Sequence, residues 1–432
     1  MGASRSVAVV TSAIIILLTV QACSGASDPV AEDRYLPSGR NDRPLSMEGG
    51  FNAYVIRAKA MIYRARVFDD PEQRHEEVDF NAPFEIRPNG AKCSNQPNRG
   101  ILMVHGLSDS PAVWRDLSAQ LVDNCYLVRT ILLPGHGTRP GDLMNVTHLD
   151  WLQSARQAVR QMSDEVDQLY VAGFSMGATI AAILAYEGEP INGLVLLSPA
   201  FRTFSRLQFM ITWLEPFMNW LHREPGEMPG RYSTMSVNGA AEFHRLSSRL
   251  FSLGRRDLEL TIPVYMALSS DDSLIDVPFA VRAFNEFLTS PHNRMLIVGD
   301  PDDTAKLAVG RRNSKIISFN SSMPDQGILK FSHIAMPYSP GNPAYGRNGV
   351  RSCGDYAEAS KDHEACRTAT EIIYTNVRGE EDSPNHFKLT FNPYFDVMSR
   401  QIIDFLARAD QGNTIPRRRL MSDSQPKWRN FF

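Results

Sequence analysis

The segment at residues 169–186, with the sequence LYVAGFSMGATIAAILAY, constrains this chain more than any other. An apolar run leads into Gly173-Phe174-Ser175-Met176-Gly177, and a stretch of small and apolar residues follows. This pattern is typical of a sharp strand-to-helix turn, which needs glycine two positions before and after its centre because a side chain there would collide with the turn. The turn exposes the serine hydroxyl at a helix N-terminus, where a developing negative charge is stabilised. Ser175 is therefore the candidate nucleophile.

Charge excludes one class of partner. The 432 residues carry 45 Lys and Arg against 48 Asp and Glu, a net charge of −3, so nothing indicates a nucleic-acid partner. The basic run at 417–419 is interpreted as part of a solvated tail at 411–432. The composition is ordinary for a soluble globular enzyme.

Residues 1–22 are typical of an export signal. Arg5 precedes an apolar stretch at 7–20, which is short for a membrane span and suits a signal-peptide core. The stretch ends in VQACSG, which resembles the lipobox of bacterial lipoproteins, where the cysteine (here Cys23) is lipidated. We expect an exported protein anchored to a membrane by this lipid through a flexible tether at 23–45, and Ser24 favours the outer membrane. Cleavage near Ala22 to give a secreted protein is the alternative.

The other four cysteines, Cys93, Cys125, Cys353 and Cys366, are an even number in an oxidising compartment. Proximity in sequence favours the disulfides Cys93–Cys125 and Cys353–Cys366 among the three possible pairings. A metal site is the competing interpretation, but no Cys-x-x-Cys spacing or histidine cluster supports it.

Apolar strands alternate with amphipathic helices along most of the chain. This alternation predicts an α/β fold, with a mostly parallel sheet covered by helices on both faces. An N-terminal helix at 51–67 and an extended lead-in up to residue 98 precede it. The predicted strands lie at 100–105, 126–133, 169–172, 194–197, 262–268, 295–298 and 315–319, and the later helices at 113–121, 149–166, 175–186, 277–288 and 395–407.

The strand rhythm stops at residue 201 and resumes at 260. The interval holds helical stretches dense in Phe, Trp, Met and Leu and no clear strand. We interpret 201–259 as an apolar helical cap over the site, with ordinary core packing as the alternative. The core then comprises 99–200 and 260–410, preceded by the N-terminal region at 46–98. A Gly-, Asn- and Pro-rich excursion at 338–385 interrupts the core.

A serine nucleophile requires a base, and the base works best when a carboxylate orients it. Asp272 follows the predicted strand at 262–268 and is the preferred carboxylate, with Asp271 and Asp276 as alternatives that also fit a turn or a helix cap. His333 follows the predicted strand at 315–319 and is the preferred base. The rival histidines His292, His363 and His386 have poorer surroundings, in a helix-to-strand loop or in the charged excursion.

The strand at 100–105 ends in His105-Gly106-Leu107. Glycine there lets the backbone approach a substrate, and N–H groups aimed at the carbonyl oxygen form an oxyanion hole. We predict that the backbone N–H groups of Leu107 and Met176 serve this purpose. The His105 side chain is expected to support the loop.

These motifs together resemble the α/β-hydrolase superfamily: HGL at 105–107, LPGHG at 133–137, GFSMG at 173–177, Asp272 after its strand, and His333. The resemblance is greatest to the carboxylesterase, monoacylglycerol lipase and lysophospholipase-like branch, which overlaps with serine aminopeptidase-type hydrolases. It implies a cofactor-free serine hydrolase with an acyl-enzyme intermediate and a mobile cap, and no metal is expected. The apolar side chains of the cap predict a small-molecule ester with an acyl chain of short to medium length as substrate, such as a monoacylglycerol or a lysophospholipid. The interval from Asp272 to His333 is longer than is usual in the family, and the excursion at 338–385 is an addition.

Two other functional classes remain open. A peptidase, amidase or thioesterase uses the same triad, and Glu215, Glu224 or Glu227 of the cap could bind the amine of a peptide substrate. A non-catalytic surface protein that retains the scaffold for binding is the other. The sequence indicates no particular oligomeric state.

Overall fold

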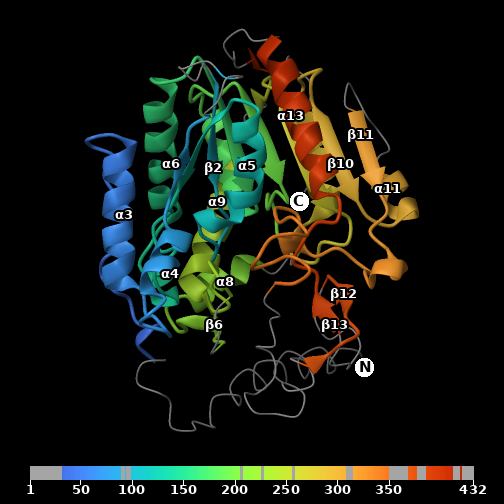
Figure 1. The fold of residues 1–432 in the computed structure, drawn as a ribbon. Helices are drawn as coiled ribbons and strands as arrows, with labels where there is room; N and C mark the ends of the chain where they lie inside the picture. Colours follow the sequence, from blue (N-terminus) through green and yellow to red (C-terminus); the bar gives the residue numbers. More distant parts are fainter. Residues whose placement is uncertain are drawn as a thin grey trace, which may run out of the picture.

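An eight-stranded sheet forms the centre of the molecule (Figure 1). The computed structural model describes residues 32–88, 93, 99–204, 208–224, 228–254, 258–307, 315–349, 368–376, 386–411 and 419–420. The strand order is β1-β3-β2-β4-β5-β9-β10-β11, with β1 antiparallel to β3 and the other neighbours parallel, which confirms the predicted sheet. The strands are β1 (Glu85–Ile86), β2 (Arg99–Val104), β3 (Leu127–Ile131), β4 (Gln168–Phe174), β5 (Gly193–Leu197), β9 (Val264–Ser269), β10 (Arg294–Val298) and β11 (Lys315–Phe319).

Helices cover both faces of this sheet, as predicted. Successive side chains of a strand point to opposite faces, so Leu102 and Val104 of β2 enter one core while Ile101 and Met103 enter the other. Both cores are fully apolar across the central strands, as expected for parallel strands buried on both sides. Figure 1 shows α5 and α13 in front of the strands. The first core is closed by α3 (Phe51–Ala65), α6 (His148–Ser163), α7 (Met176–Tyr186), α9 (Val237–Gly254) and α10 (Val277–Phe287), and the second by α5 (Arg115–Asp123) and α13 (Phe395–Gln411).

The N-terminal region differs in part from the sequence-based expectation. The predicted helix is present as α3, but the lead-in contains a second helix, α4 (Arg74–Asn81), which buries Val78. The flexible tether does not extend to residue 45, because Tyr35 is buried and the Asn41 side-chain amide donates a hydrogen bond of 2.8 Å to the His136 carbonyl. The part of residues 23–45 that the structure describes is therefore packed on the domain by specific contacts, although its polar composition predicted a flexible tether.

In the segment between β5 and β9, α8 and β6 lie toward the lower end of the described part of the molecule in Figure 1, whereas α9 lies at mid-height. It is not wholly helical, because β6 and β7 form a short antiparallel pair. The side chains of Phe204, Trp213 and Phe217 are 73%, 76% and 83% exposed, so the core-packing alternative is wrong for these three. The described elements are the 3₁₀ helix η3 (Gln208–Met210), α8 (Ile211–Leu214), β6 (Trp220–His222), β7 (Met235–Ser236) and α9.

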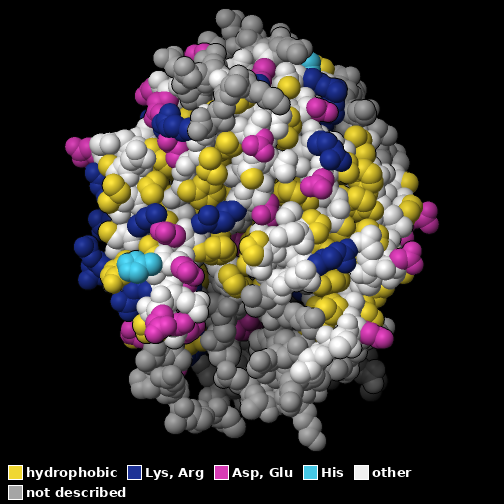
Figure 2. Space-filling model, viewed as in Figure 1, with side chains coloured by type: hydrophobic (Ala, Val, Ile, Leu, Met, Phe, Trp, Pro, Cys, Tyr) yellow, Lys and Arg dark blue, Asp and Glu magenta, His cyan; other side chains and the backbone are white. Residues whose placement is uncertain are grey.

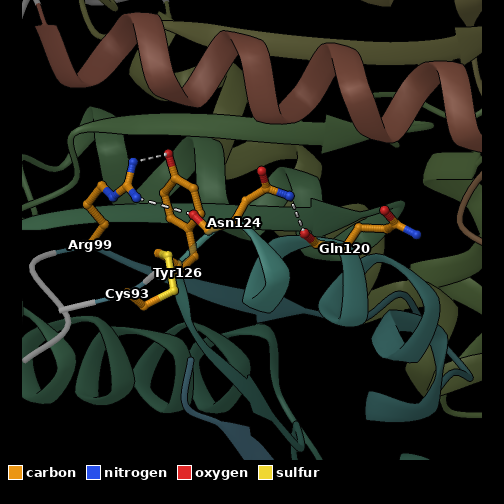
Figure 3. The surroundings of a disulfide bond; sticks show 6 residues. Cys93, Arg99, Gln120, Asn124 and Tyr126 are labelled. Atoms are coloured by element: carbon orange, nitrogen blue, oxygen red, sulfur yellow. Dashed lines mark hydrogen bonds between the residues drawn. A yellow bond between two sulfur atoms is a disulfide. The ribbon is translucent and has the colours of Figure 1, made fainter. Parts of the chain in front are cut away.

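The predicted disulfide Cys93–Cys125 is present and joins the segments that precede β2 and β3 (Figure 3). Beside it, the Arg99 guanidinium donates to the Asn124 carbonyl at 3.2 Å and lies over the Tyr126 ring. The disulfide therefore links the lead-in to the start of β3. The same region is stabilised by Asp410, whose carboxylate accepts hydrogen bonds from Arg99 and Tyr126.

Several short elements complete the described part of the chain. A segment near the end of the excursion, β12, pairs in parallel with β13, which follows the excursion directly. Arg419–Leu420 (β14) pairs with Leu258–Glu259 (β8), so this part of the predicted solvated tail contacts the domain. The remaining elements are the 3₁₀ helices η1 (Pro111–Trp114), η2 (Pro140–Met144), η4 (Pro324–Gln326) and η5 (His333–Ala335), with α11 (Pro301–Leu307), β12 (Ile373–Thr375) and β13 (His386–Lys388).

The predicted signal segment, Cys23, and the pair Cys353 and Cys366 lie outside the described residues. Within the described ranges, no helix combines the length and apolarity that a membrane crossing requires. On the face viewed in Figure 2, acidic and basic side chains are interspersed among apolar ones, which agrees with the nearly balanced charge of the chain.

Candidate active site

Ser175 lies at the sharp turn between β4 and α7. Its backbone adopts φ 55° and ψ −116°, a conformation that a non-glycine residue adopts only where the surrounding structure enforces it. A Cβ at Gly173 would collide with the backbone of Ala178, and one at Gly177 with the carbonyl oxygen of Val104. The turn is held further by the Ser175 N–H, which donates to the Leu197 carbonyl at 2.9 Å. Both glycines are therefore required for the reason that the sequence pattern predicts.

The structure brings Ser175, His333 and Asp272 into one hydrogen-bonded chain. The Ser175 Oγ lies 2.8 Å from His333 Nε2, and His333 Nδ1 lies 2.6 Å from Asp272 Oδ2. An ionised carboxylate can only accept, so the His333 proton sits on Nδ1 and leaves Nε2 to accept from the hydroxyl. The long interval between Asp272 and His333 is filled by α10, β10, α11 and β11, which belong to the core.

The two alternative acids have other roles in the structure. One oxygen of Asp271 accepts from the Phe331 N–H at 3.0 Å, which fixes the chain just before His333. Asp276 caps α10 by accepting from the Phe279 N–H at 2.9 Å, and it is paired with Arg202. Asp272 alone of the three contacts His333, and its second oxygen accepts from the N–H groups of two residues of the following turn, Leu274 and Ile275.

Two of the rival histidines lie elsewhere. His292 lies in the loop before β10, and His386 lies in β13. His363 lies outside the described residues.

The predicted oxyanion-hole residues lie beside Ser175, the candidate nucleophile. Leu107 and Met176 line the same cavity as Ser175, and neither backbone N–H has a hydrogen-bond partner within the described part of the chain. A Cβ at Gly106 would lie 3.1 Å from the Ser175 Cβ, so glycine allows the loop to approach the nucleophile this closely. Two uncommitted donors beside Ser175 form a place for a negatively charged oxygen.

His105 supports this loop, as predicted from its position. The Leu133 N–H donates to its Nε2 at 3.1 Å, so the ring proton is on Nδ1 and donates to the Gly106 carbonyl at 2.8 Å. Burial, together with the neighbouring His136, holds the pKa of His105 well below its ordinary value. Burial likewise lowers the pKa of His136 to about 4. Both rings are therefore neutral at physiological pH.

A cavity of about 1000 Å³ opens above Ser175 and His333. Its walls come from the cap, for example Phe204, Met210 and Leu214, and from Ile372 and Tyr374 at the end of the excursion. Most of these side chains are apolar, which suits an acyl chain. Figure 1 accordingly shows α8 and β6 at the same end of the molecule as β12 and β13.

In the part of the chain that the structure describes, the charged residues of the wall are Glu224, Arg231, Arg347 and Lys388. Of the cap acids that the sequence offered for amine binding, only Glu224 lines the cavity in the described chain. Glu215 is paired with Arg245, and Glu227 lies outside the described residues. The described ranges hold no cluster of His, Cys, Asp and Glu that could bind a metal ion.

Sequence reasoning missed the three cations of the wall. Arg231 lies in a loop between β6 and β7, Arg347 lies near the start of the excursion, and Lys388 lies in β13 just after it. No local pattern marks these positions, because two are loop residues and the third ends a strand of three residues, which is too short to show a periodicity.

Comparison with known proteins gives matches to hydrolases. Residues 95–248 match the family model described as serine aminopeptidase, S33. This range contains Ser175 but ends before Asp272 and His333, so the latter two positions depend on the chain order and the geometry above. The thermostable monoacylglycerol lipase of Bacillus sp. (strain H-257) is 32% identical over 101 residues, which are 23% of this chain and 40% of the relative.

Solved structures give more distant matches. One, described under the metagenome-derived lipolytic enzymes LipS and LipT, has 21% identity and a TM-score of 0.41, and the match covers 52% of this chain and 93% of that one. A soluble variant of monoglyceride lipase from Saccharomyces cerevisiae has 14% identity and a TM-score of 0.40, with 55% of this chain and 82% of that one covered.

Proposed function

We propose that this chain, which is an α/β-hydrolase similar to carboxylesterases and monoacylglycerol lipases, is a serine hydrolase that cleaves carboxylic esters through an acyl-enzyme intermediate. One observation carries the proposal. The Ser175–His333–Asp272 chain of hydrogen bonds lies at the floor of a large, mostly apolar cavity. No metal or cofactor is needed for the chemistry that these groups perform.

The proposed reaction follows from the protonation of His333, which carries its proton on Nδ1 and can accept one at Nε2. Ser175 Oγ attacks the ester carbonyl while His333 Nε2 takes the hydroxyl proton, and the carbonyl oxygen becomes an oxyanion held by the N–H groups of Leu107 and Met176. Collapse of this intermediate breaks the bond to the alkoxy oxygen, which receives the proton from His333 and leaves as an alcohol. Water then attacks the acyl-enzyme by the same two steps, and Asp272 stabilises the imidazolium each time it forms.

The substrate class is proposed from the cavity and the relative. Apolar walls suit acyl chains of short to medium length, and the similarity to a monoacylglycerol lipase favours monoacylglycerol or lysophospholipid esters. Amides, peptides and thioesters use the same triad, so the turnover of an ester, a thioester and an aminoacyl anilide should be compared directly. We expect the ester to be turned over fastest.

A fluorophosphonate probe tests the proposed chemistry. Such a probe reacts with a serine hydroxyl that a neighbouring base activates. We expect hydrolysis of p-nitrophenyl butyrate and a single covalent adduct, which mass spectrometry of the digested protein places on Ser175. A folded protein that hydrolyses nothing and takes up no probe would instead support the non-catalytic surface protein.

We propose also that the protein acts outside the cytoplasm, anchored through a lipid on Cys23. The apolar stretch at 7–20 and the disulfide Cys93–Cys125 support this location. Mass spectrometry of the mature protein should find residue 23 as an acylated N-terminus. An unmodified N-terminus beyond Cys23 would indicate a secreted protein and overturn the anchor.

A further inference from the structure

Two buried polar side chains and the partly buried side chain of Arg231, which is 17% exposed, have buried atoms without hydrogen-bond partners within the described residues. They are the hydroxyl of Ser108, both carboxylate oxygens of Asp109, and one terminal nitrogen (Nη1) of Arg231. Ser108 is 3% exposed and Asp109 2% exposed. Buried polar groups in folded proteins are almost always hydrogen-bonded, so a cluster of exceptions at one place calls for an explanation.

These groups lie together at the cavity wall. The Tyr232 N–H donates to the Ser108 carbonyl at 2.9 Å, so the loop after β2 and the loop that carries Arg231 are adjacent. Arg231 Nη1 lies 3.5 Å from Asp109 Oδ1, an ion-pair distance at which no hydrogen bond forms. Ser108 and Arg231 both line the cavity that contains Ser175.

Hydrogen bonds from Tyr345 and within the loop itself hold the loop that carries Arg231 in place. The Tyr345 hydroxyl donates to the Pro229 carbonyl at 2.7 Å, and its ring stacks on Tyr338 at a centroid distance of 4.1 Å. The Arg231 N–H donates to the Met228 carbonyl at 3.0 Å. A cation on so well supported a loop is pre-positioned, which reduces the cost of ordering it when a ligand binds.

The charge around the cavity favours an anion. Among the described residues, three cations line it (Arg231, Arg347 and Lys388), whereas one carboxylate does so, that of Glu224, which lies 3.7 Å from His222. Burial raises the pKa of Asp109, although Arg231 and His333 act in the opposite direction.

We propose that Arg231 and the Ser108 hydroxyl form an anion-binding subsite beside the nucleophile, and that the preferred esters carry a carboxylate or phosphate group. Guanidinium is suited to both, because its planar N–H donors match two oxygens of either group. The inference rests on the proposed ester hydrolysis and names the substrate class of that same site. The anion can belong to the acyl part or to the alcohol part of the ester, and the experiment separates the two.

Two matched pairs of esters test the subsite. Mono-4-nitrophenyl glutarate and 4-nitrophenyl pentanoate differ by a carboxylate on the acyl chain, and 1-butyrylglycerol-3-phosphate and 1-butyrylglycerol differ by a phosphate on the alcohol. For the wild type we expect a higher kcat/KM on the anionic member of at least one pair. Arg231→Gln should lower that value by about tenfold or more and change the neutral ester far less, because a hydrogen bond to a charged group is lost only with the anion. Arg231→Lys should retain part of the preference.

The matched control is Arg249→Gln. Arg249 lies on α9 of the cap, is paired with Glu187 and does not line the cavity, so the preference should be unchanged. If Arg231→Gln does not fold, Ser108→Ala replaces it, and a preference lowered about threefold or more supports the subsite.

The contrary results are distinct. No preference in either pair, a preference that survives Arg231→Gln, or equal losses on neutral and anionic esters would each overturn the subsite. An unchanged preference in Ser108→Ala, where that variant is the one that folds, would do the same. Failure of the wild type to hydrolyse even the neutral esters would instead overturn the proposed function.

Discussion

Replacement of Ser175 by alanine is expected to lower kcat for p-nitrophenyl butyrate by about 10⁴-fold or more, to the residual level that binding and oxyanion contacts support. The variant keeps the fold, because alanine is smaller than serine and the hydroxyl contributes only its bond to His333. KM should change little, since the hydroxyl acts in the chemical step. Steady-state kinetics and fluorophosphonate labelling measure the two consequences separately.

The control for this variant is Ser248→Ala. Ser248 lies on α9, where its hydroxyl donates to the His244 carbonyl at 2.9 Å, away from the cavity. Its replacement should leave both turnover and labelling intact. Turnover that persists at the wild-type rate in Ser175→Ala would show that another residue is the nucleophile.

Replacement of Asp272 by asparagine is expected to lower kcat by about 10³- to 10⁴-fold. The asparagine side chain has nearly the shape of the carboxylate but no charge, and its NH₂ group can donate to His333 Nδ1. A ring that accepts at Nδ1 carries its proton on Nε2 and cannot accept the proton of Ser175. The loss therefore comes from the wrong tautomer and the unstabilised imidazolium, while the fold is retained.

The neighbouring acids provide the comparison. Asp276→Asn keeps a good helix cap at α10 and should retain nearly full kcat. Thermal unfolding of both variants establishes that each is folded. Equal losses of kcat in the two variants would contradict the assignment of Asp272 as the residue that orients His333.

Local patterns in the sequence were sufficient for much of the fold. The strand-to-helix turn at Ser175 was predictable because the steric need for Gly173 and Gly177 acts within five residues of backbone. The parallel sheet was predictable because strands buried on both faces are apolar throughout, and because helices separate them. The N-terminal packing of Tyr35 and Asn41 was not predictable, because their hydrogen-bond partners are 189 and 95 positions away in the chain.

For the candidate site, chain order and strand ends located Ser175, Asp272 and His333, but the sequence left Asp271 and Asp276 as alternatives. The side chains of these three acids, which lie within six residues, point in different directions. Which of them points toward His333 depends on the turn that follows β9 and on the position of the loop that carries His333. The tertiary structure decided this choice by placing one carboxylate against the imidazole and the others against a backbone N–H and a helix end.

The sequence by itself determined the candidate nucleophile, the sheet and one disulfide, because short-range sterics, residue periodicity and proximity along the chain encode them. Only the tertiary structure decided which side chains line the cavity at Ser175: Arg231 of the cap, Lys388 beyond the excursion and Ser108 after β2 meet there from positions far apart in the sequence. These residues lie together because the cap and the described ends of the excursion contribute to one cavity, and the sequence pattern around each residue does not indicate this arrangement.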